Sequence, residues 1–176
     1  GMTNVLEPQD VDGVGGLKCS DAFPGAAYRG FQIAAQRLRH RGVLLAIASK
    51  NDDEGVRAAF AQVDGMVLTD ADIAGRRVSW NPKPEAIAEL ADEFHLGLDS
   101  FVFVDDSPYE IGAVDTQLPA VRTLLVPEDV EELPDLLAES GLFRLMRITD
   151  DDRERTLRML AEGDRTRAAT TMSHDE

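Results

Sequence analysis

The feature that most constrains the fold of this chain is the alternation of short apolar segments with segments of helical spacing. Residues 43–48 read Val-Leu-Leu-Ala-Ile-Ala, and residues 101–104 read Phe-Val-Phe-Val. Continuous apolar runs of this length are typical of strands that are covered on both faces. Helical patterns precede and follow each run. This order predicts an α/β fold in which helices cover both faces of a mainly parallel sheet, with right-handed crossovers.

The predicted elements follow one another with short connections. Helices are expected over residues 25–41, 52–62, 84–94, 107–114, 128–140 and 150–169. Strands are expected over residues 43–48, 66–68, 101–104 and 121–126. We expect residues 1–169 to form one domain, because 176 residues with 43% hydrophobic content supply one core and too little length for two. Residues 170–176 are predicted to be a disordered tail.

Composition excludes several classes of protein. A formal net charge of −15, with scattered basic residues, would repel nucleic acid. No apolar run approaches the roughly 20 residues that span a bilayer, and the polar first ten residues lack the apolar core of a signal peptide. The single cysteine, Cys19, can form no internal disulfide, which suits a reducing compartment. We therefore expect a cytoplasmic protein that binds neither nucleic acid nor membrane.

Polar residues directly after the strands are the first candidates for a site, because ligands of such sheets bind beyond the carboxyl ends of the strands. Ser49 ends the first apolar strand and is followed by Lys50 and Asn51. Its hydroxyl and backbone N–H suit an anion held near the N-terminus of the next helix. Taken alone, the pattern is more often a helix cap, formed by Ser49, Asn51 or Asp52.

Lys83 stands at the start of a predicted helix, in the segment Trp-Asn-Pro-Lys-Pro over residues 80–84. The helix dipole disfavours a cation at this end. A surface lysine is the usual explanation of such a residue. The local electrostatic cost nevertheless favours an anionic partner for Lys83.

Asp105 and Asp106 directly follow the apolar strand at residues 101–104, and Glu110 follows them. Adjacent carboxylates repel unless a cation or a shared proton relieves them. Mg²⁺ typically takes one or two protein carboxylates and completes its shell with water and substrate phosphate. The pattern therefore favours a Mg²⁺ site. The alternative is that Asp106 or Ser107 merely caps the following helix.

Taken in order, Ser49, Lys83 and the Asp105–Asp106 pair resemble motifs two, three and four of the haloacid dehalogenase (HAD) superfamily. Further segments are similar to its FkbH-like branch, HAD phosphatase subfamily IIIC. They are residues 24–28, 42–46, 49–52, 80–83, 96–106, 140–143 and 149–153. The resemblance implies a HAD-like (Rossmannoid) three-layer sandwich.

The resemblance also implies Mg²⁺-dependent phosphate chemistry. Carried over by position, Ser49 would hold phosphoryl oxygens, and Lys83 would neutralise charge on the phosphate and on an attacking carboxylate. Asp106, with Asp105, would hold Mg²⁺. The two residues after Ser49 match the pattern of the branch and are expected to lie at the phosphate site. FkbH-like proteins take glyceryl from a phosphorylated three-carbon donor and load it onto an acyl carrier protein in polyketide biosynthesis, which makes both molecules expected partners.

The first HAD motif, Asp-x-Asp-x-Thr, carries the nucleophile and the acid-base residue at the end of the first strand. Counting back from Pro24 through the segment that fits the branch places this nucleophile just upstream of Gly1, with Thr3 at the motif threonine. The central strand is therefore expected to be missing. Asp10 and Asp12 spell Asp-x-Asp-Gly, but the residues before them include a charge and a proline, which a buried central strand disfavours.

Two functions of different classes remain open. The chain is an enzyme, with the motif supplied upstream or by Asp10 and Asp12, or it is a degenerate HAD domain that binds a phosphorylated metabolite or a partner without turnover. Loss of a central strand would expose ladder edges and apolar helix faces. We therefore expect a homo-oligomer or a partner subunit.

Overall fold

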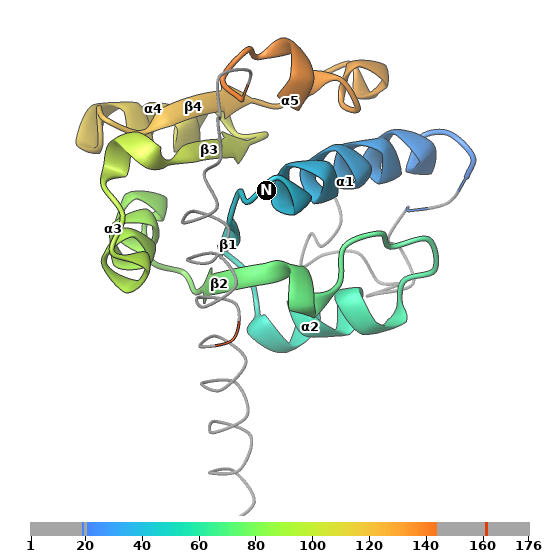
Figure 1. The fold of residues 1–176 in the computed structure, drawn as a ribbon, viewed down its shortest axis with the longest axis horizontal. Helices are drawn as coiled ribbons and strands as arrows, with labels where there is room; N and C mark the ends of the chain where they lie inside the picture. The colour runs from blue at the N-terminus through green and yellow to red at the C-terminus, as the bar shows by residue number, and fades with distance from the viewer. Residues whose placement is uncertain (1–18, 20, 144–160, 162–176) are drawn as a thin grey trace, which may run out of the picture.

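The computed structural model describes Cys19, residues 21–143 and Ala161. Helices and strands alternate along these residues (Figure 1). The strands are β1 (Leu45–Ser49), β2 (Ile73–Val78), β3 (Val102–Asp105) and β4 (Arg122–Leu125). The α-helices are α1 (Gly25–His40), α2 (Asp53–Gln62), α3 (Lys83–Phe94), α4 (Pro108–Gln117) and α5 (Leu136–Glu139). The 3-10 helices are η3 (Asp70–Asp72), η4 (Leu98–Ser100) and η5 (Val130–Glu132).

Some expectations concern other parts of the chain. The segment with Thr3, Asp10 and Asp12 lies outside the described residues. So do the tail at residues 170–176 and, apart from Ala161, the helix expected over residues 150–169. Whether Asp10, Asp12 or an upstream aspartate is the nucleophile must therefore be tested by measuring activity.

The strands of the described residues pair in parallel, as expected, but form two small sheets. β1 pairs with β2, with Ser49 opposite Val78, and β3 pairs with β4, with Asp105 opposite Leu125. The expected single sheet is therefore seen only in part, because no described strand joins β1 to β3. The carbonyl of Ser49 accepts the N–H of Ser79 and so faces β2. Successive carbonyls point to opposite edges of a strand, so the Ala48 carbonyl faces away from β2.

β1 is less covered than its apolar sequence predicts. None of its residues is buried, and Ala46, the second of them, is exposed. An apolar central strand is normally covered by neighbours on both sides and both faces. Only β2 pairs with β1 among the described residues. The expectation of a fully covered strand is therefore wrong for this part of the chain.

Helix α3 packs against both sheets and holds them together (Figure 1). Near its N-terminus, Ile87 joins a buried cluster with Phe103 of β3 and two valines from the α4–β4 region. One and two turns later, Leu90 and Phe94 pack on Ala74 of β2. Residues three, four and seven apart share one helix face. One apolar face of α3 thus fixes the ends of both sheets relative to each other.

The strand predicted over residues 66–68 is wrong. Gln32 of α1 is fully buried, and its side-chain oxygen accepts the N–H groups of Val67 and Leu68 at 2.9 and 3.1 Å. Its amide nitrogen donates to the sulfur atoms of Cys19 and Met66. A side chain therefore satisfies the backbone where strand pairing was expected. The segment is apolar because Leu68 packs in the core with Leu38.

The strand that pairs with β1 is β2, which the sequence pattern missed. Gly75, Arg76 and Arg77 interrupt its apolar run, so it lacks the pattern of a covered strand. The single helix predicted over residues 128–140 is also wrong. Pro134 has no backbone N–H and breaks the segment into η5 and α5.

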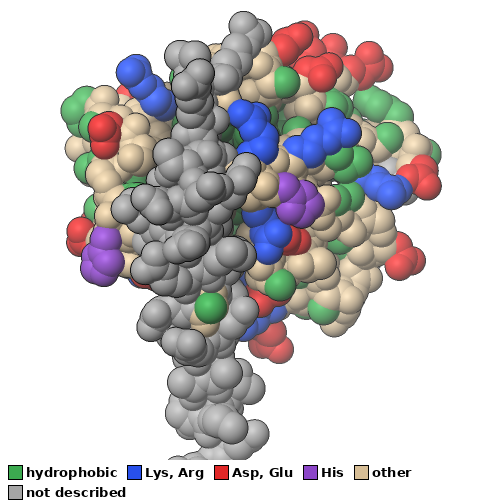
Figure 2. Space-filling model, viewed as in Figure 1, with side chains coloured by type: hydrophobic (Ala, Val, Ile, Leu, Met, Phe, Trp, Pro, Cys, Tyr) green, Lys and Arg blue, Asp and Glu red, His purple; other side chains and the backbone are tan. Residues whose placement is uncertain are grey.

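Surface charge is uneven. Acidic side chains gather where η5 and α5 lie, at the upper edge of the face in Figure 2. The exposed acids of this segment are Glu128, Asp129, Glu131, Glu132, Asp135 and Glu139. Among the described residues, no helix combines the length and the apolar character that crossing a bilayer requires.

Candidate active site

The residues singled out in the sequence lie at the ends of β1 and β3 and at the start of α3. Ser49 is the last residue of β1, Lys83 is the first residue of α3, and Asp105 is the last residue of β3. Lys83 contacts both strands directly, because its Nζ lies 2.5 Å from the Ala48 carbonyl oxygen of β1 and 3.3 Å from Asp105 Oδ2 of β3. Lys83 thus joins the edge of β1 that faces away from β2 to the end of β3.

Lys83 is nearly fully buried, with 3% of its surface exposed. Its ammonium group lies between the Ala48 carbonyl, the Asp105 carboxylate and the ring of Phe103, whose centroid is 5.8 Å away. A buried ammonium group needs such partners, because its desolvation is expensive. The anionic partner expected for Lys83 is therefore Asp105.

The two carboxylates of the strand-end pair have different surroundings. Asp105 is 2% exposed, and its Oδ1 accepts the N–H of Ser107 at 2.9 Å while Oδ2 faces Lys83. Burial raises the pKa of Asp105, but Ser107 and Lys83 are among the contacts that hold this pKa below its ordinary value. Asp106 is half-buried. Asp106 is therefore the carboxylate of the pair that solvent reaches more easily.

The helix-cap alternatives are now assigned to particular residues. Asp52 is the N-cap of α2, with its side chain accepting the N–H of Gly55. Ser107 is the N-cap of α4. Ser49 lies in β1 and Asp106 precedes the cap, so capping does not account for either residue. The side-chain oxygen of Asn51 accepts the N–H of Asp52 at 2.7 Å.

A second ion pair joins the loop after β1 to α4. Lys50 Nζ lies 2.5 Å from Glu110 Oε1, and the two side chains are 33% and 12% exposed. The sequence pattern placed Lys50 at the phosphate site and noted Glu110 only as a further acid. The contact between them was not predicted, because spacing along the chain does not show which loop faces the first turn of α4.

No group of three or more His, Cys, Asp or Glu side chains within the described ranges is placed to hold a metal ion. A site built from Asp105 and Asp106 stays below that size. Mg²⁺ often uses only one or two protein carboxylates. The pair therefore suits Mg²⁺ better than a metal that needs a complete protein cage.

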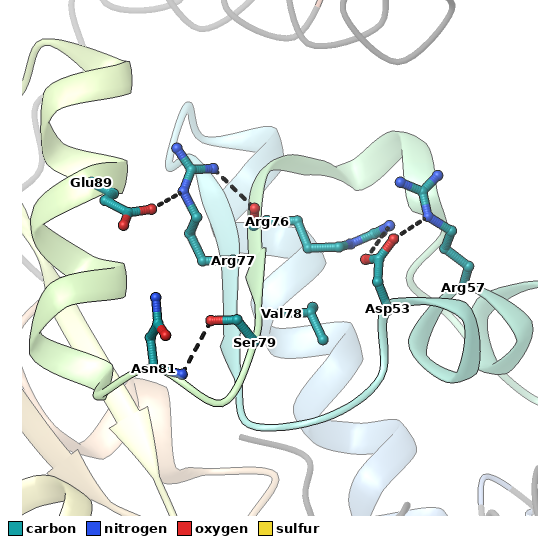
Figure 3. A pocket seen from close by; sticks show the side chains of 8 residues that line it. All are labelled: Asp53, Arg57, Arg76, Arg77, Val78, Ser79, Asn81 and Glu89. Atoms are coloured by element: carbon teal, nitrogen blue, oxygen red, sulfur yellow. Dashed lines mark hydrogen bonds and ion pairs between the residues drawn. The ribbon is translucent and has the colours of Figure 1, made fainter. Parts of the chain in front are cut away.

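A cavity of about 360 Å³ lies beside β2, between α2 and α3 (Figure 3). Neither Lys83 nor Asp105 and none of the other predicted site residues lines it, although Ser79 at its rim contacts Ser49 through the backbone. Its arginines are paired with acids: Arg57 with Asp53, Arg76 with Asp70 and Asp53, and Arg77 with Glu89 and Glu93. Four acids thus face three arginines, so the cavity has no excess positive charge with which to bind an anion.

Comparison with known proteins gives one informative match. No protein-family model and no curated protein matches the chain. The chain is similar to a crystal structure of the N-terminal part of protein BF1531 from Bacteroides fragilis, which contains a phosphatase domain and is complexed with Mg. The TM-score is 0.72 and the identity 30%, over 76% of this chain and 36% of that one. This chain therefore spans about a third of the length of that structure, and the likeness supports a HAD-like phosphatase fold.

Proposed function

We propose that this chain is a HAD-type phosphatase or phosphotransferase domain that acts on a phosphorylated small molecule with Mg²⁺. The observation that carries the proposal is the contact of Lys83 with Asp105 and with the Ala48 carbonyl, because Asp106 and Ser49 directly follow these two residues. The likeness to a phosphatase domain solved with Mg supports it.

Mg²⁺ fits the charges of the proposed site. Lys50 and Lys83 bring two positive charges, and Asp105, Asp106 and Glu110 bring three negative ones. Without a metal, an incoming phosphate would meet one net negative charge, whereas bound Mg²⁺ makes the site net positive. We infer that Asp106, with Asp105 behind it, holds the ion.

Each remaining residue then has a separate role. Bound Mg²⁺ would polarise the phosphoryl group. The hydroxyl of Ser49 would hold a phosphoryl oxygen, next to Lys50 and Asn51, whereas its backbone N–H faces β2 together with its carbonyl. Lys83 would stabilise negative charge on the phosphate and on the attacking carboxylate. Because Asp105 and Ala48 hold its ammonium in place, little reorganisation is needed when substrate binds.

The attacking carboxylate would come from an Asp-x-Asp-x-Thr segment in which Thr3 is the threonine, or from Asp10 and Asp12. All of these positions lie outside the described residues. The second candidate function is a degenerate HAD domain that binds a phosphorylated metabolite or a partner without turnover. It is favoured by the sequence before Asp10, where a charge and a proline interrupt the apolar residues that a buried strand needs.

The segments similar to FkbH-like proteins support a finer proposal. In it, a cytoplasmic enzyme removes phosphate from a phosphoglycerate-type donor and loads glyceryl onto an acyl carrier protein in polyketide biosynthesis. Its support is the match of sequence segments such as residues 49–52 and 96–106.

Turnover and binding are tested separately on the same chain. Hydrolysis of 4-nitrophenyl phosphate with Mg²⁺ measures turnover, and calorimetric titration with inorganic phosphate measures binding. Activity that Lys83→Met and Asp10→Asn both abolish supports an enzyme that uses Asp10. Binding without turnover supports the degenerate domain. If the chain neither hydrolyses the ester nor binds phosphate with Mg²⁺, the proposed function is wrong.

A further inference from the structure

The segment from Ser107 to Glu110 has a sequence pattern that the structure uses in an unusual way. Ser-x-x-Glu before a helix normally forms a capping box, in which the serine side chain binds the glutamate N–H and the glutamate side chain binds the serine N–H. Ser107 Oγ accepts the Glu110 N–H at 3.4 Å. The Ser107 N–H, however, donates to Asp105 Oδ1 at 2.9 Å. The Glu110 carboxylate is thus released from the box.

Glu110 uses its carboxylate to hold Lys50. Its Oε1 lies 2.5 Å from Lys50 Nζ, and its side chain is only 12% exposed. Ion pairs that are partly shielded from water have a stronger preference for one geometry than fully exposed pairs. A free lysine side chain has many rotamers. Glu110 therefore restricts the position of the Lys50 ammonium to one place.

That place is beside the proposed phosphate site. Lys50 directly follows Ser49, and Glu110 lies four residues after Asp106. The same short segment, residues 105–110, supplies the acid that holds Lys83 and the acid that holds Lys50. The two cations of the site are thus both oriented by one structural unit, the end of β3 and the first turn of α4.

We propose that Glu110 is a positioning residue that holds the Lys50 ammonium where it binds a phosphoryl oxygen of the substrate. The inference rests on the proposed function, because phosphate is the ligand in both. Lys50 keeps further N–H donors beyond the one directed at Glu110, so it can bind phosphate without leaving Glu110. Lys50 is then the residue that touches the substrate, and Glu110 acts through it.

The test must separate positioning from simple charge. Removing the Glu110 carboxylate also removes a negative charge near the phosphate, which by itself tightens phosphate binding. The Lys50→Met background measures this charge effect alone, because Glu110 then has no ammonium to hold. We therefore compare Glu110→Gln in the native chain and in Lys50→Met, by calorimetric titration of inorganic phosphate at saturating Mg²⁺.

We compare the factor by which Glu110→Gln changes the Kd for phosphate in each background. This factor should be about tenfold larger in the native chain than in Lys50→Met, a difference within the usual range of coupling energies between contacting residues. Glu110→Gln should change the affinity for Mg²⁺ alone by the same factor in the native chain and in Lys50→Met, because its charge effect on the cation does not depend on the Lys50 ammonium. Glu89→Gln is the matched control, because it removes an equal charge from an ion pair of 2.7 Å with Arg77 outside the site. It should leave phosphate binding unchanged.

Equal effects of Glu110→Gln in both backgrounds would overturn the inference and leave the proposed function intact. If the native chain binds no phosphate with Mg²⁺, the proposed function is wrong and the inference falls with it. Should Glu110→Gln fail to fold, Glu110→Asp replaces it, with a shorter carboxylate and a smaller but still Lys50-dependent loss. Absence of that dependence would also reject the inference.

Discussion

At the scale of single residues, the site is organised by two ion pairs that lie at different depths. Lys83 and Asp105 are buried together, whereas Lys50 and Glu110 are partly open to solvent. A buried pair contributes little net stability when intact, but breaking it leaves an uncompensated charge in the interior. A substitution that breaks the Lys83–Asp105 pair should therefore destabilise the fold as well as alter the site.

The first prediction concerns the removal of Lys83. Lys83→Met should lower the free energy of unfolding by about 3 kcal/mol at neutral pH, because Asp105 is left buried without its cation. The double variant Lys83→Met, Asp105→Asn should recover part of this loss. Urea unfolding followed by circular dichroism measures both values. A single variant as stable as the native chain would show that the pair is not buried in solution.

The second prediction concerns pH. The folded-state pKa of Asp105 lies below its unfolded value, so its carboxylate stabilises the fold above the ordinary value of 3.8, and this contribution is lost as pH falls through the lower folded-state pKa. The stability difference between the native chain and Asp105→Asn should thus be full at neutral pH and shrink below about pH 3.8.

The control for this pH dependence is Asp92→Asn, which changes an exposed acid of α3. Its effect should stay within about 0.5 kcal/mol at every pH. Unfolding curves at a series of pH values provide the comparison. A difference for Asp105→Asn that does not depend on pH would contradict the assigned direction of the pKa.

At the scale of elements, close packing of α3 on β2 positions Lys83. Gly75 of β2 lies directly beneath Leu90 and Phe94 of α3, and a Cβ atom at Gly75 would come within 2.5 Å of the Phe94 ring. The first turn of α3 is held over the end of β1 by this packing. A glycine in a strand often marks such a close approach.

The third prediction uses two glycines as a matched pair. Gly75→Ala should destabilise the fold by about 1–3 kcal/mol, because the added methyl group overpacks the contact with α3. Gly112→Ala in α4 adds the same group where nothing lies within 4 Å, and should stabilise the chain by roughly 0.5–1 kcal/mol through helix propensity. Thermal unfolding compares the two. Equal effects would refute the close packing of α3 on β2.

Sequence alone predicted the elements whose patterns reflect local burial. β3 and its acid pair were predicted because an apolar run ended abruptly in two charges. β2 was missed because Arg76 and Arg77 form ion pairs with acidic side chains, so the strand lacks a continuous apolar pattern. Pro134 was a visible signal against a continuous helix. The contacts of Lys83 and Lys50 were not predictable, since they depend on how separate loops meet in space.

At the scale of the whole molecule, two described strands, β1 and β4, carry exposed apolar side chains. Ala46, the second residue of β1, is exposed, and Leu125 of β4 is 46% exposed. The acidic face over η5 and α5 lies at the upper edge in Figure 2, and the chain carries a formal net charge of −15. Apolar attraction and charge repulsion therefore act on association in opposite directions.

The last prediction weighs these two effects through ionic strength. We expect the chain to self-associate through its apolar strand surface, with like-charge repulsion as the opposing contribution. Raising ionic strength from about 0.01 M to about 0.15 M shortens the Debye length from about 30 Å to about 8 Å, which screens that repulsion. Sedimentation velocity should therefore show stronger association at the higher salt concentration.

Ala46→Glu, which adds a charge to the apolar surface of β1, should weaken association at both concentrations. A monodisperse monomer under all conditions would mean that the exposed surface of β1 does not drive self-association, whereas weaker association at higher salt would mean that attraction between charges holds the copies together.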